Sequence, residues 1–241
     1  MTAKKVGQSL IVTMALCLST ATGHAQGYKI FIMGGASSLT DPRTFTERDI
    51  NYSSAYAGGA KVIAGVEAPF YKIFGIEASY GLGPNNLRIN NNSYSYSFSK
   101  GYGERNSRYS ADIVGHVPGV WRGIRAYGVV GVEYDVFSPT SSAKTLAKTQ
   151  GFACEIGNTA TCSATLSSQG EGGFNIGGGL DYKVASKVDL RLDVRDHVFG
   201  SPTYGLPTTF SVPSAAYFPI SGSAHDLEYS IGIVYRFGKS K

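Results

Sequence analysis

A period-two alternation of apolar and polar residues, repeated in eight segments, most constrains what this chain can fold into. Successive side chains of a β-strand point to opposite faces, so each segment predicts a strand with one apolar and one polar face. The clearest example is 187–199, where Val and Leu alternate with Asp and Arg. The predicted strands are 27–37, 55–67, 71–83, 106–117, 123–137, 174–184, 187–199 and 227–237.

The connections between these segments alternate in length. Three are short turns, near Pro69, Pro118-Gly119 and Ala185-Ser186, whereas four are long and rich in Ser, Asn, Thr and Gly. Loops of that length are uncommon in a compact soluble domain. Short turns at one end and long loops at the other are typical of outer-membrane barrels, whose strands need about 9–11 residues to cross the bilayer. The long connections are 38–54, 84–105, 138–171 and 200–225.

Alternation alone does not decide which face meets water, because a soluble lipocalin-like barrel keeps its apolar face inside. Composition favours the membrane orientation. Only 16% of residues are charged, and many of the 31 glycines lie on the polar face, where a narrow interior needs room. Aromatic residues lie on the apolar face near strand ends, as interfacial girdles do. A helical membrane protein is excluded because no apolar run after residue 26 approaches about 18–20 residues.

The N-terminal segment 1–25 is expected to be a cleaved signal peptide, leaving 26–241 as the barrel domain. It has a basic start at Lys4-Lys5, a short apolar stretch over 10–18 and the small-residue site Gly23-His24-Ala25. Without it the formal charge falls to +3, which gives no electrostatic case for nucleic-acid binding.

Two cysteines remain in the mature chain, Cys154 and Cys162. An even pair, close in sequence within an exported protein, predicts a local disulfide. A metal site is the alternative, but no His or further Cys lies nearby in the sequence.

The C-terminal segment 230–237 resembles the assembly signal of the eight-stranded outer-membrane β-barrel family, which includes OmpA-type and OmpX-type barrels and opacity-like surface antigens. Ser230, Gly232, Tyr235 and Phe237 occupy its polar, glycine and aromatic positions. The segments 172–195 and 125–132 also resemble strands of that family. The resemblance implies a closed, all-β, antiparallel, up-and-down eight-stranded transmembrane barrel in the bacterial outer membrane. It also implies contact with lipid and lipopolysaccharide, and insertion by the outer-membrane assembly machinery.

The polar face would line the barrel interior, which in an eight-stranded barrel is just wide enough for side chains to fill. Nine basic and ten acidic residues lie on that face, so we expect near-balanced charges that pair and plug the lumen. The expected network includes Arg125, Glu133, Asp181, Asp189, Arg191, Asp193, Arg195, Glu228 and Arg236.

We expect a structural or surface-interaction role, without enzymatic activity and without a cofactor. Surface binding would use the aromatic residues of 84–105, although a polar loop facing lipopolysaccharide fits the same segment; these aromatics are Tyr94, Tyr96, Phe98 and Tyr102. One alternative is a small porin-like channel.

Another alternative is a lipid A-modifying enzyme, either a deacylase or an acyltransferase. It would draw a Ser/His/acid group from His197, Ser201, 221–223 and His225-Asp226, residues that also come together by chance in a Ser-rich chain.

Overall fold

The computed structural model describes residues 27–39, 43–47, 50–92, 97–149, 152–156, 159–208 and 222–237, and within 39–57, 86–100 and 151–162 it describes only the backbone. The predicted signal peptide therefore lies outside the described residues. None of the helices in the described ranges has the length and apolarity to cross a membrane.

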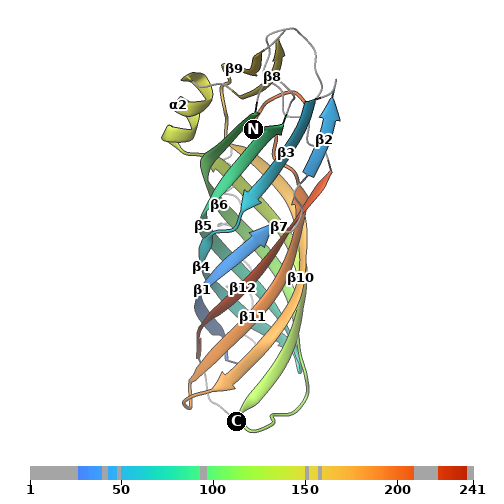
Figure 1. Ribbon diagram of the computed structural model, residues 1–241. Helices are drawn as coiled ribbons and strands as arrows, with labels where there is room; N and C mark the ends of the chain where they lie inside the picture. The colour runs from blue at the N-terminus through green and yellow to red at the C-terminus, as the bar shows by residue number, and fades with distance from the viewer. Residues whose placement is uncertain are drawn as a thin grey trace.

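Eight antiparallel strands close into a barrel (Figure 1). They are β1 (Lys29–Leu39), β4 (Ala60–Tyr71), β5 (Phe74–Asn92), β6 (Ser97–His116), β7 (Ile124–Pro139), β10 (Gln169–Lys183), β11 (Val188–Gly200) and β12 (Ser223–Arg236). Each strand pairs with its neighbours along the chain, and β1 pairs with β12 to complete the ring. The predicted eight-stranded, up-and-down barrel is confirmed.

The strands are staggered around the ring. Lys29 on β1 pairs with a residue of β4, which pairs with a residue of β5, and so on around the ring to Asp226 on β12. Asp226 pairs in turn with Leu39 on β1, ten residues beyond Lys29. A stagger of this size in an eight-stranded barrel corresponds to strands tilted by about 40° from the barrel axis. Such a barrel has a narrow interior that side chains fill.

The two ends of the barrel differ, as the connections predicted. At one end, here called the turn end, short connections join β4 to β5, β6 to β7 and β10 to β11. The start of β1 pairs with the end of β12 at the same end of the barrel. The turn between β6 and β7 uses left-handed backbone at Gly119 and Gly123 (φ 96° and 85°), a region that favours glycine. The turn between β4 and β5 falls at Lys72-Ile73, slightly beyond the position expected near Pro69.

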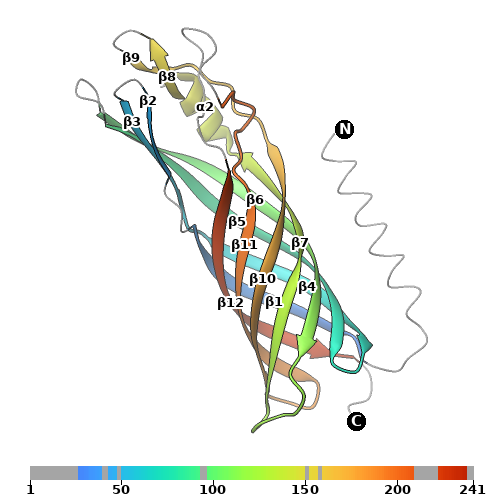
Figure 2. The same ribbon diagram turned by 90° about the vertical axis from the view of Figure 1, so that its right-hand side faces the viewer.

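At the other end, here called the hairpin end, the long connections contain further secondary structure (Figures 1 and 2). They carry β2 (Arg43–Glu47), β3 (Ile50–Ala57), α2 (Ser141–Thr149), β8 (Phe152–Ile156) and β9 (Thr159–Cys162). The prediction that 84–105 is a loop was wrong, because β5 and β6 remain paired as far as Asn92 and Ser97. Their hydrogen-bonded ladder continues beyond the barrel wall despite the Asn- and Ser-rich sequence.

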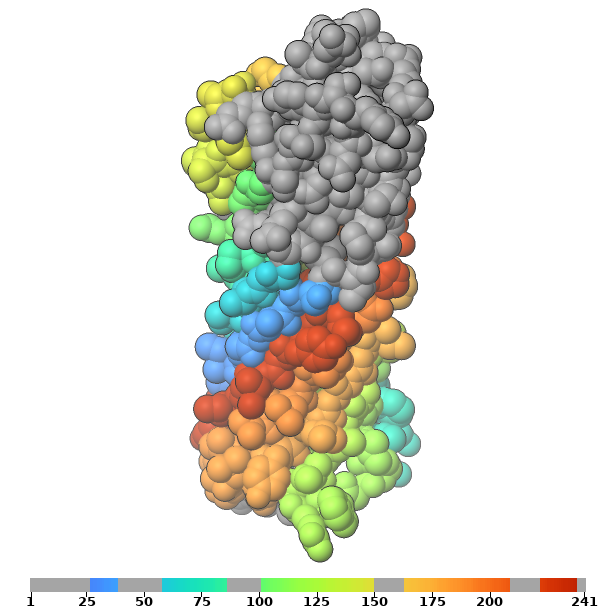
Figure 3. Space-filling model, in the orientation of Figure 1, coloured from blue at the N-terminus to red at the C-terminus, as the bar shows by residue number. Residues whose placement is uncertain are grey.

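The outward positions of the barrel strands are mostly apolar, whereas the charged side chains point inward, together with a few buried apolar residues such as Phe31, Met33 and Val234. This arrangement is the reverse of a lipocalin-like barrel and confirms the membrane-type orientation. Figure 3 shows β1, β12 and β11 forming a continuous outer wall. Exposed apolar side chains on the outer wall include Ile32, Val62, Ile76, Ile113, Val130, Val132, Ile176, Leu192, Ile231 and Ile233.

Aromatic residues mark both edges of this apolar wall. Exposed aromatics at the turn end are Phe70, Tyr71, Phe74, Trp121, Tyr182, Tyr235 and Phe237. Towards the hairpin end, Tyr80 and Tyr109 pack with their ring centroids 5.0 Å apart. Tyr134 lies opposite Tyr109 on β7. Paired aromatic girdles of this kind flank the lipid-facing band of membrane barrels.

Candidate functional site

The described part of the barrel interior contains two clusters of charged side chains, one above the other. The cluster nearer the turn end is built around Arg191, whose side chain has no exposed surface. Its guanidinium donates to Asp181 (2.8 Å), Glu77 (2.9 Å) and Glu67 (3.0 Å), carboxylates from three different strands. The same guanidinium lies 4.6 Å from the ring centroid of Tyr127. One arginine thereby links β4, β5, β10 and β11 across the lumen.

Arg195 extends this turn-end cluster by a further layer. It donates to Glu77 (2.6 Å), Asp193 (2.7 Å) and Asp112 (2.9 Å). Asn175 donates to the other oxygen of Asp112 at 2.7 Å. The carboxylate of Glu77 therefore bridges the two arginines, one through each oxygen.

Lys29 and His116 lie inside the lumen at the turn end. Lys29 Nζ lies 2.8 Å from Glu67 Oε1, and His116 Nε2 lies 2.7 Å from the same oxygen. These groups belong to β1, β4 and β6, so their contacts link three strands at the turn end of the lumen.

The hairpin-end cluster is built around Arg108 on β6. Arg108 donates to Asp135 on the neighbouring strand (2.9 Å), and to Asp226 (3.1 Å) and Glu228 (3.3 Å) on β12. Lys61 donates to Asp226 at 2.5 Å. The arginine spans the lumen, because β6 and β12 lie on opposite sides of the ring.

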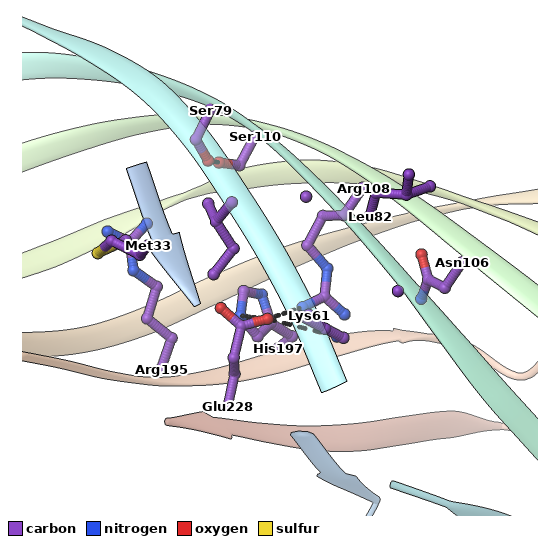
Figure 4. Close-up of a pocket in the computed structure, with 13 residues that line it drawn as sticks. Met33, Lys61, Ser79, Leu82, Asn106, Arg108, Ser110, Arg195, His197 and Glu228 are labelled. Atoms are coloured by element: carbon purple, nitrogen blue, oxygen red, sulfur yellow. Dashed lines mark hydrogen bonds and ion pairs between the residues drawn. The ribbon is translucent and has the colours of Figure 1, made fainter. Parts of the chain in front are cut away.

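His197 joins this hairpin-end cluster from β11. Its Nδ1 lies 2.6 Å from Glu133 Oε2, and its Nε2 is directed at Glu228, 3.8 Å away. Figure 4 shows His197, Glu228, Lys61 and Arg108 facing one another inside the barrel. A cavity of about 20 Å³ remains beside these groups, reaching Ser79, Ser110 and Asn106. That space suffices for about one water molecule.

The buried charges are not balanced, contrary to the near-balance expected from the sequence. Lys183 and Lys187 are exposed at the turn end, and Arg125 and Arg236 are only partly buried there. Among the described side chains, five basic residues are buried, namely Lys29, Lys61, Arg108, Arg191 and Arg195. In the same part of the chain eleven acidic residues are buried, namely Glu67, Glu77, Glu104, Asp112, Glu133, Asp135, Asp181, Asp189, Asp193, Asp226 and Glu228. The lumen therefore has an acidic excess, moderated by shared arginines and by two histidines.

Glycines make room for these charged side chains. A Cβ at Gly131 would overlap the Asp112 carboxylate, and one at Gly177 would overlap Arg195. A Cβ at Gly179 would meet the Tyr127 ring and the Leu192 carbonyl. The glycines of the polar face thus occupy the positions where neighbouring side chains cross the narrow lumen.

Aromatic side chains lie inside the barrel at the hairpin end. Phe137 and Phe199 lie with their ring centroids 5.3 Å apart, and Arg108 lies 5.8 Å from the centroid of Phe199. The buried Tyr204, in left-handed backbone (φ 56°), donates its hydroxyl to Glu104 at 2.5 Å. These contacts lie above the hairpin-end cluster.

The predicted surface aromatics do not form one exposed patch among the described residues. Tyr102 is buried, because it lies on the inward face of β6, and it cannot serve as a surface contact in this structure. Tyr94 and Tyr96 lie outside the described residues, and the Phe98 side chain is not described. The loop prediction for this segment implies an exposed Tyr102, which is wrong because β6 runs through this residue.

The other predicted site residues lie on β12 or directly after it. Arg236 donates to Asp189 at 2.7 Å at the turn end. Ser230 faces the interior, a Cβ at Gly232 would overlap the Ile32 carbonyl, and the outward rings of Tyr235 and Phe237 pack edge to face at 4.8 Å. An assembly role for these residues stays a prediction.

Cys154 and Cys162 lie in the β8–β9 hairpin, where Cys162 pairs with Phe152. The disulfide between the two cysteines stays a prediction. Within the described ranges, no group of three or more His, Cys, Asp or Glu side chains is arranged to hold a metal ion.

Sequence reasoning missed several interior residues. Phe31 and Tyr127 lie on inward faces and sandwich Arg191, at 5.2 and 4.6 Å. Asn106 is buried at the start of the predicted strand, and Glu104 continues this inward parity of β6 into the segment predicted as a loop. Extending the period-two pattern of β6 towards the N-terminus would have found them.

The Ser/His/acid grouping considered from the sequence separates in the structure. His197 and Asp226 face the lumen, whereas His225 faces outward and lies 3.1 Å from Asp196. His225 and Asp226, adjacent in the sequence, therefore lie on opposite faces of β12.

The solved structure of one outer membrane protein agrees with this architecture. OprG from Pseudomonas aeruginosa is similar at 17% identity and a TM-score of 0.56, over 90% of this chain and 99% of that one. Ail, the attachment invasion locus protein of Yersinia pestis, is similar at 12% identity and a TM-score of 0.42, over 88% and 99%. No curated protein sequence matches the chain. The model of the outer membrane protein beta-barrel domain matches residues 9–237, and the chain belongs to that family.

Proposed function

We propose that this protein is an integral protein of the bacterial outer membrane with a structural or surface-interaction role and a lumen closed to diffusion. The observation that carries this proposal is the pair of charged clusters in the lumen, the turn-end cluster and the hairpin-end cluster. In them Arg191, Arg195 and Arg108 each bridge several strands. A lumen crossed by buried ion pairs leaves no continuous aqueous path of the kind found in larger porins. The alternative of a small porin-like channel requires such a path.

Single-channel recording in planar bilayers tests the closed lumen. The folded monomer should show no steady conductance, because a current would require the arginine bridges to separate. Steady, large openings from protein shown to be folded would overturn the plug and favour the porin-like alternative. Protein unfolded by heat before addition serves as the control for detergent artefacts.

The surface role is supported by the ordered structure beyond the barrel at the hairpin end, where β5 and β6 extend together and α2 and the β8–β9 hairpin lie nearby (Figure 1). In the proposed orientation this end faces outward from the cell. Surface elements of this kind present side chains to an extracellular ligand or to lipopolysaccharide.

Trimming the β5–β6 hairpin tests the surface role. Leu87 pairs with Tyr102, so residues 88–101 can be replaced by a two-residue turn without disturbing the pairing below. If this hairpin binds a host surface, adhesion of cells that display the trimmed protein should fall to background. A matched deletion of 152–162 serves as the control. Adhesion unchanged by either deletion would leave only the structural role.

Location and processing follow from the same proposal. We expect cleavage before Gln26, contact of the outer wall with lipid and lipopolysaccharide, and insertion by the outer-membrane assembly machinery. N-terminal sequencing of protein from an outer-membrane fraction checks the cleavage. Recovery of an uncleaved chain in the inner membrane would contradict it.

A further inference from the structure

Each of the three short turns at the turn end carries an aromatic residue directly followed by a basic one. The pairs are Tyr71-Lys72 where β4 turns into β5, Trp121-Arg122 between β6 and β7, and Tyr182-Lys183 where β10 turns into β11. All six side chains are exposed. The turns lie together at the lower end of the barrel in Figure 1. A pattern that recurs at three separate turns indicates that they share one environment.

The three turns are also neighbours around the rim. The Ile73 carbonyl accepts a hydrogen bond from the His116 amide at 2.7 Å, which joins the β4–β5 turn to the end of β6. The Gly123 carbonyl accepts one from the Lys183 amide at 2.9 Å, which joins the β6–β7 turn to the β10–β11 turn. Lys187 is exposed in that last turn. The exposed cations therefore follow one arc, here called the basic rim, which consists of Lys72, Arg122, Lys183 and Lys187.

Acidic side chains at the turn end do not neutralise this arc at the surface. Every acidic residue that the structure describes at this end is buried. Asp181 and Asp189, which flank the β10–β11 turn, contact Arg191 and Arg236 at 2.8 and 2.7 Å instead. The acidic excess of the molecule therefore lies in the lumen, whereas the basic rim presents four positive charges to its surroundings.

The aromatic partners fix the level at which these cations lie. The Arg122 guanidinium is 5.2 Å from the ring centroid of Trp121, and Lys72 Nζ is 5.8 Å from that of Tyr71. Cations at such distances are attracted by the face of the ring. Because Trp and Tyr prefer the boundary between hydrocarbon and headgroups, the cations beside them are placed at the depth of the lipid phosphates.

The chemistry of the basic rim matches a phosphate group carried by a lipid. A guanidinium donates to two phosphate oxygens at once, and an ammonium acts as a compact positive charge. A zwitterionic phospholipid balances its phosphate with its own ammonium, whereas an anionic phospholipid keeps a net negative charge. A surface with only positive exposed charges favours the anionic lipid.

We propose that the basic rim binds anionic phospholipids in the leaflet that meets the turn end and enriches them around the barrel. The inference rests on the proposed membrane location and is independent of whether the lumen is closed. A lipid is favoured over a soluble polyanion because each cation of the three pairs directly follows a residue of the aromatic girdle, at the edge of the lipid-facing wall.

Quenching of Trp121, the only tryptophan of the chain, tests this enrichment at the basic rim itself. Two sets of vesicles contain phosphatidylcholine with the same low fraction of phosphatidylglycerol. In one set the phosphatidylglycerol carries brominated acyl chains, and in the other an equal number of phosphatidylcholine molecules carry them. Each basic residue near the headgroups favours an anionic lipid by about fivefold at most, so brominated phosphatidylglycerol should quench as if its local content were about threefold or more above the bulk. At about 1 M salt this preference should shrink, because exposed charges are screened.

Charge-neutral variants identify the residues responsible. The combined substitutions Lys72→Gln, Arg122→Gln, Lys183→Gln and Lys187→Gln should make the two sets of vesicles quench equally. Arg105→Gln, Lys144→Gln and Lys148→Gln together are the matched control, because these basic residues are exposed at the hairpin end and should leave the preference unchanged. Gel mobility before and after heating checks that each variant is folded.

The outcomes separate this inference from the proposed location. Equal quenching of the wild-type protein by the two sets, or a preference that survives in the four-residue variant, would overturn the binding of anionic lipid and leave the membrane location intact. No quenching by either set would contradict the location and this inference together. Binding of soluble polyglutamate to the folded protein, without any preference for brominated phosphatidylglycerol, would identify an acidic polymer as the partner and would also overturn the proposal.

Discussion

Individual buried arginines hold the two sides of this barrel together. Arg191 satisfies carboxylates from three strands and is enclosed by the rings of Phe31 and Tyr127. The inward parity of Arg191 and Arg195 could be predicted from period two alone. Their partners could not, because Glu67 and Glu77 come from strands more than a hundred positions away, and the stagger of the ring decides which carboxylates meet.

Replacing Arg191 with methionine should destabilise the barrel by about 3–5 kcal/mol, because the change leaves buried carboxylates without their cation. The change is measured by urea unfolding of the protein in micelles. Arg125→Met is the control, since that side chain is only partly buried, and surface changes of this kind cost about 0.5 kcal/mol or less. Equal effects of the two substitutions would contradict the structural role of the clusters.

Two glycines on opposite faces should respond differently to alanine. Gly131→Ala places a Cβ against Asp112 and the Ala111 carbonyl and should cost about 1–3 kcal/mol, the usual range for overpacking. Gly34 faces outward, and no atom lies within 4 Å of the position that a Cβ would take, so Gly34→Ala should be close to neutral. The same unfolding assay decides. A neutral Gly131→Ala would show that the lumen is looser than these contacts indicate.

At the scale of elements, the strands and turns were predicted well and the hairpin end was predicted poorly. Lipid contact on one face and crowding on the other impose a strict alternation, which the sequence displays wherever the wall crosses the apolar band. Beyond the band both faces of β5 and β6 carry polar residues, such as Asn85, Arg105 and Asn106. Pairing persists there through backbone hydrogen bonds, which leave little trace in a hydrophobic pattern.

The turn between β6 and β7 supplies a natural probe of membrane depth. Trp121, the only tryptophan of the chain, lies in this turn and is 68% exposed. In vesicles its fluorescence should be quenched most strongly by lipids brominated near the headgroup, because Trp prefers the membrane interface. Urea-unfolded protein provides the unquenched reference. Quenching that is strongest at the bilayer centre, or absent, would contradict the proposed placement of the turn end.

At the scale of the whole molecule, the class of fold and the orientation of its faces could be predicted from the chain, whereas the charge distribution could not. Near-balance would require every charged residue of inward parity to be buried. Lys183 and Lys187 have that parity but lie at the rim, where water reaches them. Depth along the barrel axis, which a one-dimensional pattern does not contain, therefore decides which charges are buried.

The closed ring should make the molecule resistant to detergent. Unheated protein in dodecyl sulfate should migrate faster in a gel than heated protein, because a barrel whose strands all have two partners stays compact until it is melted. The ratio of the two bands against temperature measures this. A single band at every temperature, together with a periplasmic location, would contradict the membrane barrel.

The pairing of β1 with β12 has a consequence for how the molecule is made. The strand that closes the ring on β1 is β12, the barrel strand farthest from β1 along the chain, so until β12 arrives the growing sheet has two unsatisfied edges. Open edges recruit other strands and favour aggregation. Synthesis of this chain must therefore be followed by a protected interval in which its edges are shielded, and ring closure, rather than the formation of any one hairpin, is the event that ends that vulnerability.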